Sequence, residues 1–270
     1  MYEFQAYFVI MNIIKEGGCM ANKKRVQRRK KKKGKSPIRF LFILLTELVV
    51  LLGILLYLYI YHPDNPISTA LHKMIDPIPE VVLDAGHGGY DSGSEFNGVL
   101  EKDVTLALTK DIGAALEAKG IPVCYTRESD DVAWPADNIK DLDARVQIAN
   151  TSGAKLFVSI HTNASETKTG SGFEIWGDYN DKTILNFAKH IQTSVNTLGY
   201  TMDRGLKDVA ISPLQVLYKN KLPSVLLEAG FLESERDRTY LLQDGRRKAF
   251  ANKIAEGIYK TLQDEKKKHS

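Results

Sequence analysis

The sequence VVLDAGHGGYDSG, residues 81–93, joins a short apolar run to a glycine-rich loop that carries one histidine, His87. The run of Val, Val and Leu is typical of a buried strand in a parallel sheet, because such a strand is covered on both faces. Glycines after a strand let the backbone approach a ligand without a steric penalty, and we expect Gly86, Gly88 and Gly89 to do so here. An ordinary tight turn has the same pattern, so the stretch alone leaves its function open.

Strand-like and helix-like segments alternate from this stretch to the C-terminus. We expect strands at residues 81–84, 122–126, 155–161, 172–176 and 224–228, and helices at residues 102–119, 142–152, 182–198 and 235–262. This alternation predicts an α/β domain with a largely parallel sheet. We place the domain at residues 81–265.

An apolar segment, FLFILLTELVVLLGILLYLYIY, fills residues 40–61 and contains one charged residue, Glu47. A membrane-spanning helix needs roughly 20 apolar residues, whereas the apolar part of a signal peptide has about 7 to 15. Tyr57, Tyr59 and Tyr61 at its end are typical of a membrane interface. We therefore expect one transmembrane anchor, and the alternative is a buried core helix.

The flanks of this segment predict its orientation. The basic block KKRVQRRKKKKGK, residues 23–35, is typical of the cytoplasmic side, which makes residues 1–39 cytoplasmic and the C-terminal domain extracytoplasmic. Residues 62–80 contain four prolines and predict a semi-rigid stalk. The peptide KEGGCM, residues 15–20, is what a ribosome-binding site followed by a start codon would encode, so we expect Met20 to be the initiator and residues 1–19 to be untranslated.

Charge and cysteine content exclude some classes of protein. Residues 1–61 contain 12 Lys and Arg against 3 Asp and Glu, and the remainder contains 25 against 30, a net charge of −5. A nucleic-acid-binding surface on the folded part is therefore not expected. The two cysteines, Cys19 and Cys124, allow no disulfide framework and no cysteine-based metal site.

Four ionisable residues stand at or beside the ends of predicted elements. His87 follows the first strand, Glu101 begins the first helix, and His161 and Glu228 each end a strand. Ligands of open α/β sheets bind beyond the carboxyl ends of the strands. Two imidazoles and one carboxylate make a catalytic zinc site with a position left for water. A second, unligated carboxylate can take a proton from that water and deliver it to a leaving amine, and Glu228 is the candidate.

Other readings of the glycine-rich loop are weaker. GHGGYDSG fails the dinucleotide-binding pattern at its last glycine and lacks the Lys-Ser/Thr of a P-loop. The chain also has no G-x-S-x-G elbow for a serine nucleophile.

Five ordered segments, LDAGHGGYDSGS, LEKDVTLAL, LFVSIHTNAS, DRGLK and VLLEAGFLES, resemble the zinc-dependent N-acetylmuramoyl-L-alanine amidases of bacterial cell walls. The resemblance implies that His87, Glu101 and His161 bind one Zn²⁺ and that Glu228 is the catalytic carboxylate. It implies a three-layer sandwich with a mostly parallel mixed sheet flanked by helices. The implied substrate is the amide between muramic acid and L-alanine of peptidoglycan, in cell-wall remodelling or spore cortex formation.

Two alternatives remain open from the residues. One is another zinc peptidase or deacetylase, and the other is a catalytically inactive peptidoglycan-binding module, which Glu228 disfavours because binding needs no proton shuttle. The segment between His161 and Glu228 contains no long extra helix, so we expect an open groove. A regulatory protein partner is not identified by the sequence.

Five further residues are candidates for supporting roles. Asp84 could accept a hydrogen bond from a ligand histidine or only cap the loop. Asn163 and Glu174 could contact the glycan or peptide. Arg145 and Arg204 could bind a stem-peptide carboxylate, although an ion pair on a helix face is the stronger expectation for Arg145.

Overall fold

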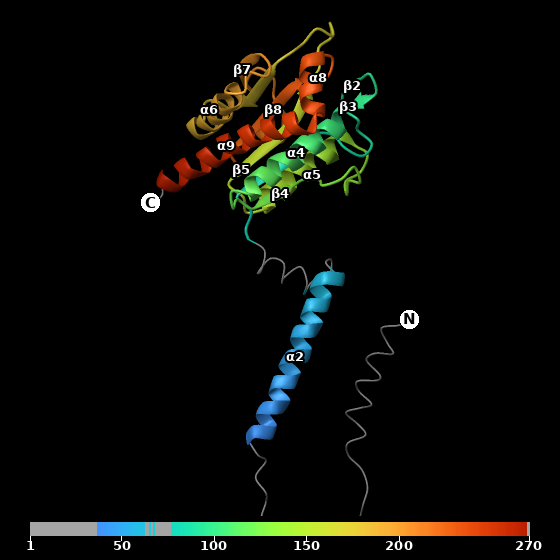
Figure 1. Ribbon diagram of the computed structural model, residues 1–270, viewed down its shortest axis with the longest axis vertical. Coiled ribbons are helices and arrows are strands. Elements are labelled where there is room, and N and C mark those ends of the chain that lie inside the picture. The colour runs from blue at the N-terminus through green and yellow to red at the C-terminus, as the bar shows by residue number, and fades with distance from the viewer. Residues whose placement is uncertain (1–36, 63–64, 66, 68–76, 269–270) are drawn as a thin grey trace, which may run out of the picture. The chain divides into compact units, whose positions relative to one another are not determined.

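The computed structural model describes residues 37–62, 65, 67 and 77–268, with side chains from residue 41 onward. The chain divides into two compact units, Met1–Ser68 and Thr69–Ser270, which are described separately (Figure 1). The basic block, the expected untranslated start and most of the expected stalk lie outside the described residues.

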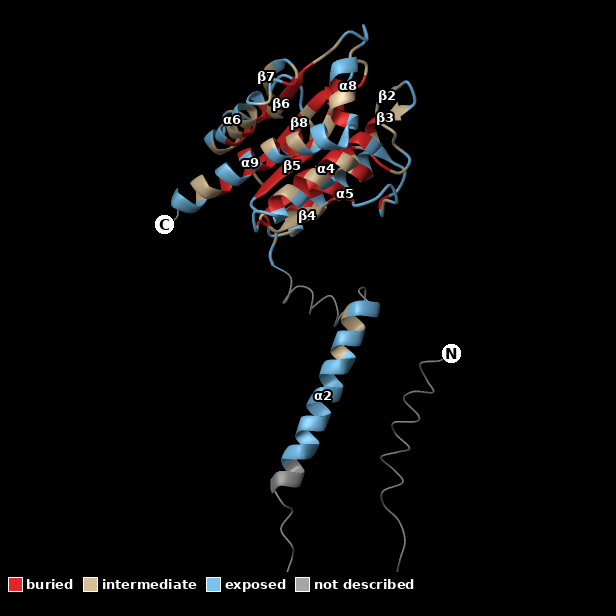
Figure 2. Ribbon diagram, viewed as in Figure 1, coloured by how far each residue is buried: buried red, intermediate tan, exposed pale blue. Residues whose placement is uncertain are grey.

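The first unit contains helix α2 (Pro37–Tyr61). Its segment Leu41–Tyr61 has a mean hydropathy of 2.7 and no part of it is buried; the ribbon of this helix in Figure 2 is mostly pale blue, with tan turns near its end. Among the described residues, α2 is the one helix long and apolar enough to cross a membrane. The predicted span therefore corresponds to a helix, while its insertion and orientation stay predictions.

The second unit is built on one six-stranded sheet with the strand order β4-β1-β5-β8-β6-β7. The first four strands in this order are parallel, β6 is antiparallel to β8, and β7 is parallel to β6. The strands are β1 (Val81–Ala85), β4 (Val123–Tyr125), β5 (Leu156–Asn163), β6 (Phe173–Gly177), β7 (Asp203–Asp208) and β8 (Ser224–Phe231). The predicted mostly parallel mixed sheet is confirmed.

Helices cover both faces of this sheet and complete the predicted three-layer sandwich (Figure 1). They are α4 (Glu101–Glu117), α5 (Asn138–Thr151), α6 (Lys182–Asn196), α7 (Gln215–Tyr218), α8 (Glu235–Leu242) and α9 (Asp244–Lys268). Helix α9 packs against both α4 and α6, and these helices form the larger core with one face of the sheet. Helices α5 and α7 form a smaller core with the other face.

Side-chain alternation along the strands separates the two cores. In β5, Leu156, Val158 and Ile160 pack into the larger core, whereas Phe157 packs into the smaller one. Because successive side chains point to opposite faces, His161 lies on the same face as Phe157. The functional face of the sheet is thus the one that α5 and α7 cover.

Three features differ from the elements that the sequence predicts. The last expected helix is two helices, α8 and α9, because Gln243 between them is extended. Strand β7 and helix α7 were not expected. The third is a two-stranded hairpin, β2 (Glu95–Phe96) and β3 (Val99–Leu100), whose turn at Asn97 and Gly98 has two positive φ angles, as Asn-Gly hairpins require. This hairpin leads directly into Glu101.

Candidate functional site

The loop after β1 holds His87 in an unusual backbone conformation. His87 has a φ of 59°, a region that costs a non-glycine residue about 1 kcal/mol or more. Gly88 and Asp91 close the loop with two backbone hydrogen bonds of 2.9 and 3.1 Å. The loop therefore presents His87 in a conformation that its surroundings must stabilise.

Two arginines supply that stabilisation by binding the carbonyl oxygens at the start of the loop. Arg145 donates to the oxygens of Ala85 and His87, each at 2.7 Å. Arg127 donates to the oxygens of Ala85 and Gly86 at 3.0 and 2.9 Å. Both guanidinium groups are buried, so the hydrogen bonds are shielded from water and strong.

Arg145 is in turn fixed by two carboxylates. It forms ion pairs with Asp84 at 2.8 Å and with Asp141 at 2.5 Å, and its side chain is 2% exposed. The expected ion pair on α5 is confirmed, since Asp141 lies one turn before Arg145. The alternative expectation, that Arg145 binds a substrate carboxylate, is wrong because its guanidinium is enclosed by these partners.

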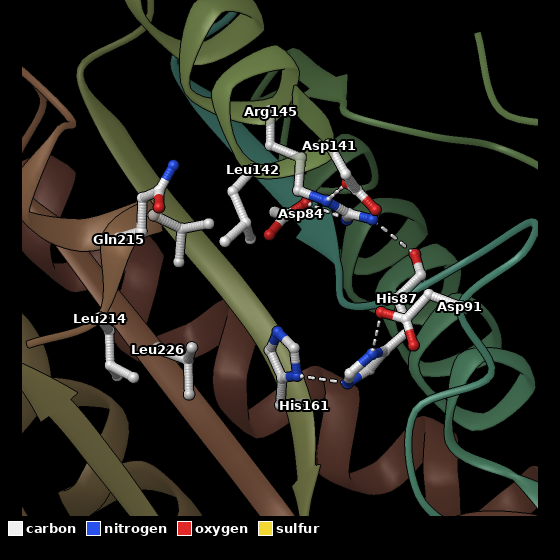
Figure 3. A pocket seen from close by; sticks show the side chains of 11 residues that line it. Asp84, His87, Asp91, Asp141, Leu142, Arg145, His161, Leu214, Gln215 and Leu226 are labelled. Carbon is white, nitrogen blue, oxygen red and sulfur yellow. Dashed lines mark hydrogen bonds and ion pairs between the residues drawn. The ribbon is translucent and has the colours of Figure 1, made fainter. Parts of the chain in front are cut away.

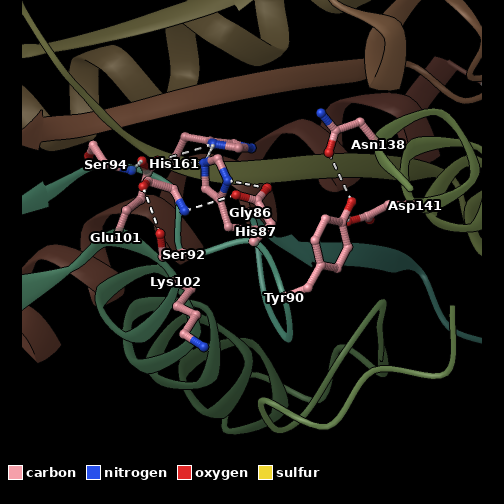
Figure 4. Close-up of polar contacts among 12 residues, drawn as sticks. Gly86, His87, Tyr90, Ser92, Ser94, Glu101, Lys102, Asn138, Asp141 and His161 are labelled. Atoms are coloured by element: carbon pink, nitrogen blue, oxygen red, sulfur yellow. Dashed lines mark hydrogen bonds and ion pairs between the residues drawn. The ribbon is translucent and has the colours of Figure 1, made fainter. Parts of the chain in front are cut away.

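Three of the predicted site residues meet at one point (Figure 4). Nε2 of His87 lies 3.1 Å from Nδ1 of His161, and each of these nitrogens lies 3.2 Å from Oε1 of Glu101. The three atoms thus form a nearly equilateral triangle. Ligand atoms about 2.0–2.2 Å from a shared tetrahedral zinc ion are roughly 3.3 Å apart, so this triangle fits the metal.

Asp91 orients the first imidazole. Its Oδ2 lies 2.7 Å from Nδ1 of His87, which places the ring proton on Nδ1 and turns the Nε2 lone pair toward the triangle. The expectation that Asp84 serves a ligand histidine is wrong. Asp84 accepts hydrogen bonds from Thr126 and Ser159 and pairs with Arg145.

Glu101 is held at both carboxylate oxygens. Oε1 accepts a hydrogen bond from the amide of Thr162 at 2.8 Å, and Oε2 accepts one from the amide of Ser94 at 2.9 Å. Burial opposes ionisation, but the contacts with His161 and His87 outweigh it and hold the pKa of Glu101 below its usual range. Burial likewise lowers the pKa of His87, while Glu101 and Asp91 more than compensate and raise it to about 9.

The loop glycines make room for protein side chains. A Cβ at Gly86 would lie 2.4–2.7 Å from atoms of the His161 ring, and one at Gly88 would lie 2.7 Å from Nε of Arg127. We expected these glycines to let a ligand approach the backbone, but the structure gives them another role. They let a candidate metal ligand and a loop-stabilising arginine pack against the loop.

Glu228 lies beside His161, its direct partner on the neighbouring strand. Its Oε2 is buried and has no hydrogen-bond partner among the residues that the structure describes. Burial raises the pKa of Glu228 to about 7, with His161 opposing the shift and the nearby carboxylates of Glu101 and Glu174 adding to it. Such a carboxyl group can accept and release a proton near neutral pH.

A pocket of about 170 Å³ adjoins the two histidines. Figure 3 shows His87 and His161 on one side of it and Leu142, Leu214 and Leu226 on another. Arg145 and Asp84 also line the pocket but are already paired with each other. The pocket therefore offers an apolar wall next to the candidate metal centre.

The remaining candidates form one hydrogen-bonded group on β5, β6 and β7. Glu174 accepts from Nδ2 of Asn163 at 2.9 Å, from Nε1 of Trp176 at 3.0 Å, and from Nε of Arg204 at 2.8 Å. Glu174 is buried and Arg204 is partly exposed. Sequence reasoning named three of these residues but not their mutual contact.

Comparisons with known proteins give the relatives of this chain. A family model described as N-acetylmuramoyl-L-alanine amidase matches residues 81–260. The germination-specific N-acetylmuramoyl-L-alanine amidase of Bacillus subtilis (strain 168) is 35% identical over an alignment of 224 residues, which covers 77% of this chain and 89% of that protein.

Two solved structures have the same fold. The N-acetylmuramoyl-L-alanine amidase AmiC2 of Nostoc punctiforme is 31% identical with a TM-score of 0.61, and the match covers 69% of this chain and 98% of that chain. The CwlD amidase from Clostridioides difficile, solved in complex with the GerS lipoprotein, is 30% identical with a TM-score of 0.60, covering 68% and 98%.

Proposed function

The chain belongs to the N-acetylmuramoyl-L-alanine amidase family and is thus a cell-wall hydrolase, and we propose that it acts as a zinc enzyme. The bond cleaved is the amide between the lactyl group of N-acetylmuramic acid and L-alanine of the peptidoglycan stem peptide. His87, Glu101 and His161 are the zinc ligands in this proposal, and Glu228 is the catalytic carboxylate.

The triangle of His87 Nε2, His161 Nδ1 and Glu101 Oε1 is the observation that carries the proposal. Two neutral imidazole nitrogens and a carboxylate oxygen repel one another at about 3 Å unless a cation or a proton lies between them. Two histidines and a carboxylate are the donors of a catalytic zinc site that keeps one position open. Zinc at this centre would polarise the scissile carbonyl and make an attacking water acidic near neutral pH.

Glu228 supplies the proton transfers in the proposed mechanism. Its carboxylate takes a proton from the attacking water and then delivers it to the nitrogen of the departing L-alanine, which leaves as an amine. The unpartnered Oε2 supports this role because no described protein group competes for it. With a pKa near 7, Glu228 can both accept and release a proton at neutral pH. A cation at the neighbouring centre would lower this pKa.

We place the amidase domain on the outer side of the cytoplasmic membrane. Helix α2 supports an anchor, because an apolar helix exposed along its length fits a bilayer better than water. The basic block before it supports a cytoplasmic N-terminus. This location brings the domain to peptidoglycan. Similarity to a germination-specific amidase supports a role of this activity in the spore.

The proposal is tested on the detergent-solubilised full chain with purified muropeptides. We expect mass spectrometry to detect free stem peptide with a new N-terminal alanine, lost with chelator and restored by zinc. Cleavage at another bond would identify a peptidase or deacetylase instead. Binding of peptidoglycan without release of any product would identify an inactive binding module.

The proposed topology has its own test. A C-terminal tag on the full chain should be digested by external protease in intact protoplasts, while an N-terminal tag is protected. The reverse pattern would contradict the orientation.

A further inference from the structure

A row of ionisable side chains crosses the sheet from the candidate metal centre toward its β7 edge. His161 on β5 is the direct partner of Glu228 on β8, and Glu228 is the direct partner of Glu174 on β6. Directly paired residues point to the same face of a sheet. Arg204 on β7 continues the row through its 2.8 Å ion pair with Glu174.

Arg204 is held rigidly by three contacts. Glu174 binds its Nε, and the guanidinium lies over the ring of Phe231 with 4.9 Å between its Cζ and the ring centroid. Its stem passes Gly172, where a Cβ would lie 2.9 Å from Cγ of Arg204. A guanidinium that is fixed before a ligand arrives loses little conformational entropy on binding.

The outer edge of this guanidinium remains available. Arginine has five N–H donors. The Nε–H binds Glu174, and one Nη1–H makes a 3.4 Å contact with the carbonyl oxygen of Ser171. The Nη2 group has no hydrogen-bond partner among residues 77–268, and the side chain is 33% exposed. A guanidinium group that is held in place and has free N–H donors matches the geometry of a carboxylate.

We propose that Arg204 binds a free carboxylate of the substrate peptide and makes the enzyme prefer acidic over amidated stem peptides. This inference rests on the proposed amidase function. It names a specificity-determining residue, since Arg204 contacts neither the scissile amide nor the candidate zinc ligands.

The spacing of the strands fits this role. Neighbouring strands lie about 4.8 Å apart, so β5 and β7, three steps apart, are separated by roughly 14 Å. An extended peptide covers about 3.5 Å per residue. A carboxylate borne two to four residues beyond the scissile amide therefore reaches the row at Arg204 when the peptide runs across β8 and β6.

A second cationic side chain lies near Arg204 at this edge. Lys207, the direct partner of Trp176, lies on the same face of the sheet as Arg204. It forms no ion pair with any residue of the described part of the chain. Arg204 is paired with Glu174, so Lys207 is a second cationic side chain on the face that the peptide would cross.

The competing explanation is that Arg204 only compensates the buried charge of Glu174. The two roles differ in what a substitution changes. If Arg204 only compensates the charge of Glu174, its loss would alter the ionisation of Glu228 and lower the turnover of every substrate alike. Loss of a carboxylate receptor would raise the KM for peptides that carry the carboxylate and leave amidated peptides unaffected.

The test uses two muramoyl tripeptides of the same sequence, one with free carboxylates on its second and third residues and one with both amidated. We expect kcat/KM of the zinc-loaded full chain to be at least tenfold higher for the acidic peptide. Arg204→Leu should raise the KM for the acidic peptide at least tenfold. The KM for the amidated peptide should change less than twofold, so that the preference is abolished. Arg204→Lys should restore part of it. Arg246→Leu is the control, because Arg246 is an exposed arginine that lies over another ring, that of Tyr240.

Equilibrium binding separates this inference from the proposed function. Calorimetry on Glu228→Gln, with and without Arg204→Leu, gives Kd for both peptides without any turnover. A preference for the acidic peptide that depends on Arg204 supports the inference even if no amide is cleaved. Equal Kd values, or an equal loss of kcat for both peptides in Arg204→Leu, would overturn it.

Discussion

The guanidinium of Arg145 donates a 2.7 Å hydrogen bond to the carbonyl oxygen of His87, from a helix that begins more than fifty residues later in the chain. This contact ties the left-handed residue of the loop to the buried Asp84–Arg145–Asp141 cluster. The position of the first candidate zinc ligand therefore depends on the packing of α5 against the sheet.

Arg145→Lys tests that dependence. Lysine keeps the charge but cannot span both carboxylates and both carbonyl oxygens, so acceptors are left unsatisfied at about 1–3 kcal/mol each. We expect a Tm lower by several degrees and weaker zinc binding in a competition titration with a fluorescent chelator. Arg246→Lys, on an exposed position, should change neither quantity. Unaltered zinc affinity in Arg145→Lys would mean that His87 is held by the loop alone.

Asp91→Ala tests the orientation of the His87 ring. Without the acceptor at Nδ1, the imidazole is free to rotate and to change tautomer, and loss of such a partner typically weakens metal binding about 10–100-fold. The same titration measures this loss. Asp131→Ala, at an exposed position in another loop, provides the matched control and should bind zinc like the parent chain.

Glu228→Gln and His161→Ala separate catalysis from metal binding. Glutamine has the shape of glutamate but cannot accept the proton, so turnover should fall about 10²–10⁴-fold while zinc content stays at one per chain. His161→Ala should lose both zinc and turnover, because it removes one corner of the triangle. Metal analysis after dialysis and the stem-peptide assay give the two readouts. Glu228→Gln with parental turnover would show that another group moves the proton.

The sequence predicted the parts of the fold that have strong local patterns. Apolar runs identified five of the six sheet strands, and the periodicity of the helices identified their main bodies. Strand β7, DRGLKD, was missed because it is polar and takes its hydrogen-bond partners from β6 at the edge of the sheet. The break at Gln243 was missed because no proline or glycine stands there to end α8.

The candidate ligands were predictable because parallel strands end at one edge of a sheet, which brings His87 and His161 together. The supporting residues were not. Asp91 reaches His87 only because the loop reverses through positive φ angles. Arg127 and Arg145 act on the loop from about 40 and 60 residues away in sequence, a distance at which local patterns carry no information.

Stability at acid pH should depend on Asp84. Burial alone would raise its pKa, but the charge of Arg145 and hydrogen bonds from Ser159 and Thr126 hold the pKa below its usual value. The folded state therefore binds this proton less readily than the unfolded state. Ionised Asp84 therefore contributes to the free energy of unfolding above the ordinary carboxyl pKa of about 4. This contribution is lost as the pH falls through the lower pKa that Asp84 has in the folded state.

Asp84→Asn should remove that contribution. We expect the variant to be about 3–5 kcal/mol less stable than the parent at pH 7, because Arg145 loses a buried partner, and the difference should shrink as pH falls below 4. Denaturant unfolding of both chains between pH 3 and pH 7 measures it. A difference independent of pH would show that Asp84 contributes packing and not charge.

Gly86→Ala tests whether the loop glycine is required by the space that His161 occupies. A Cβ at this position would lie 2.4–2.7 Å from ring atoms of His161, so the imidazole must move away from Nε2 of His87 and the triangle must open. We expect zinc affinity and turnover to fall while the fold is retained, since the clash involves a partly exposed ring. Gly245→Ala is the matched control, because a Cβ there meets nothing within 4 Å and alanine in a helix gains about 0.5–1 kcal/mol over glycine. Zinc binding by Gly86→Ala at the parental affinity would place His161 outside the metal site and leave the proposed ligand set without its third member.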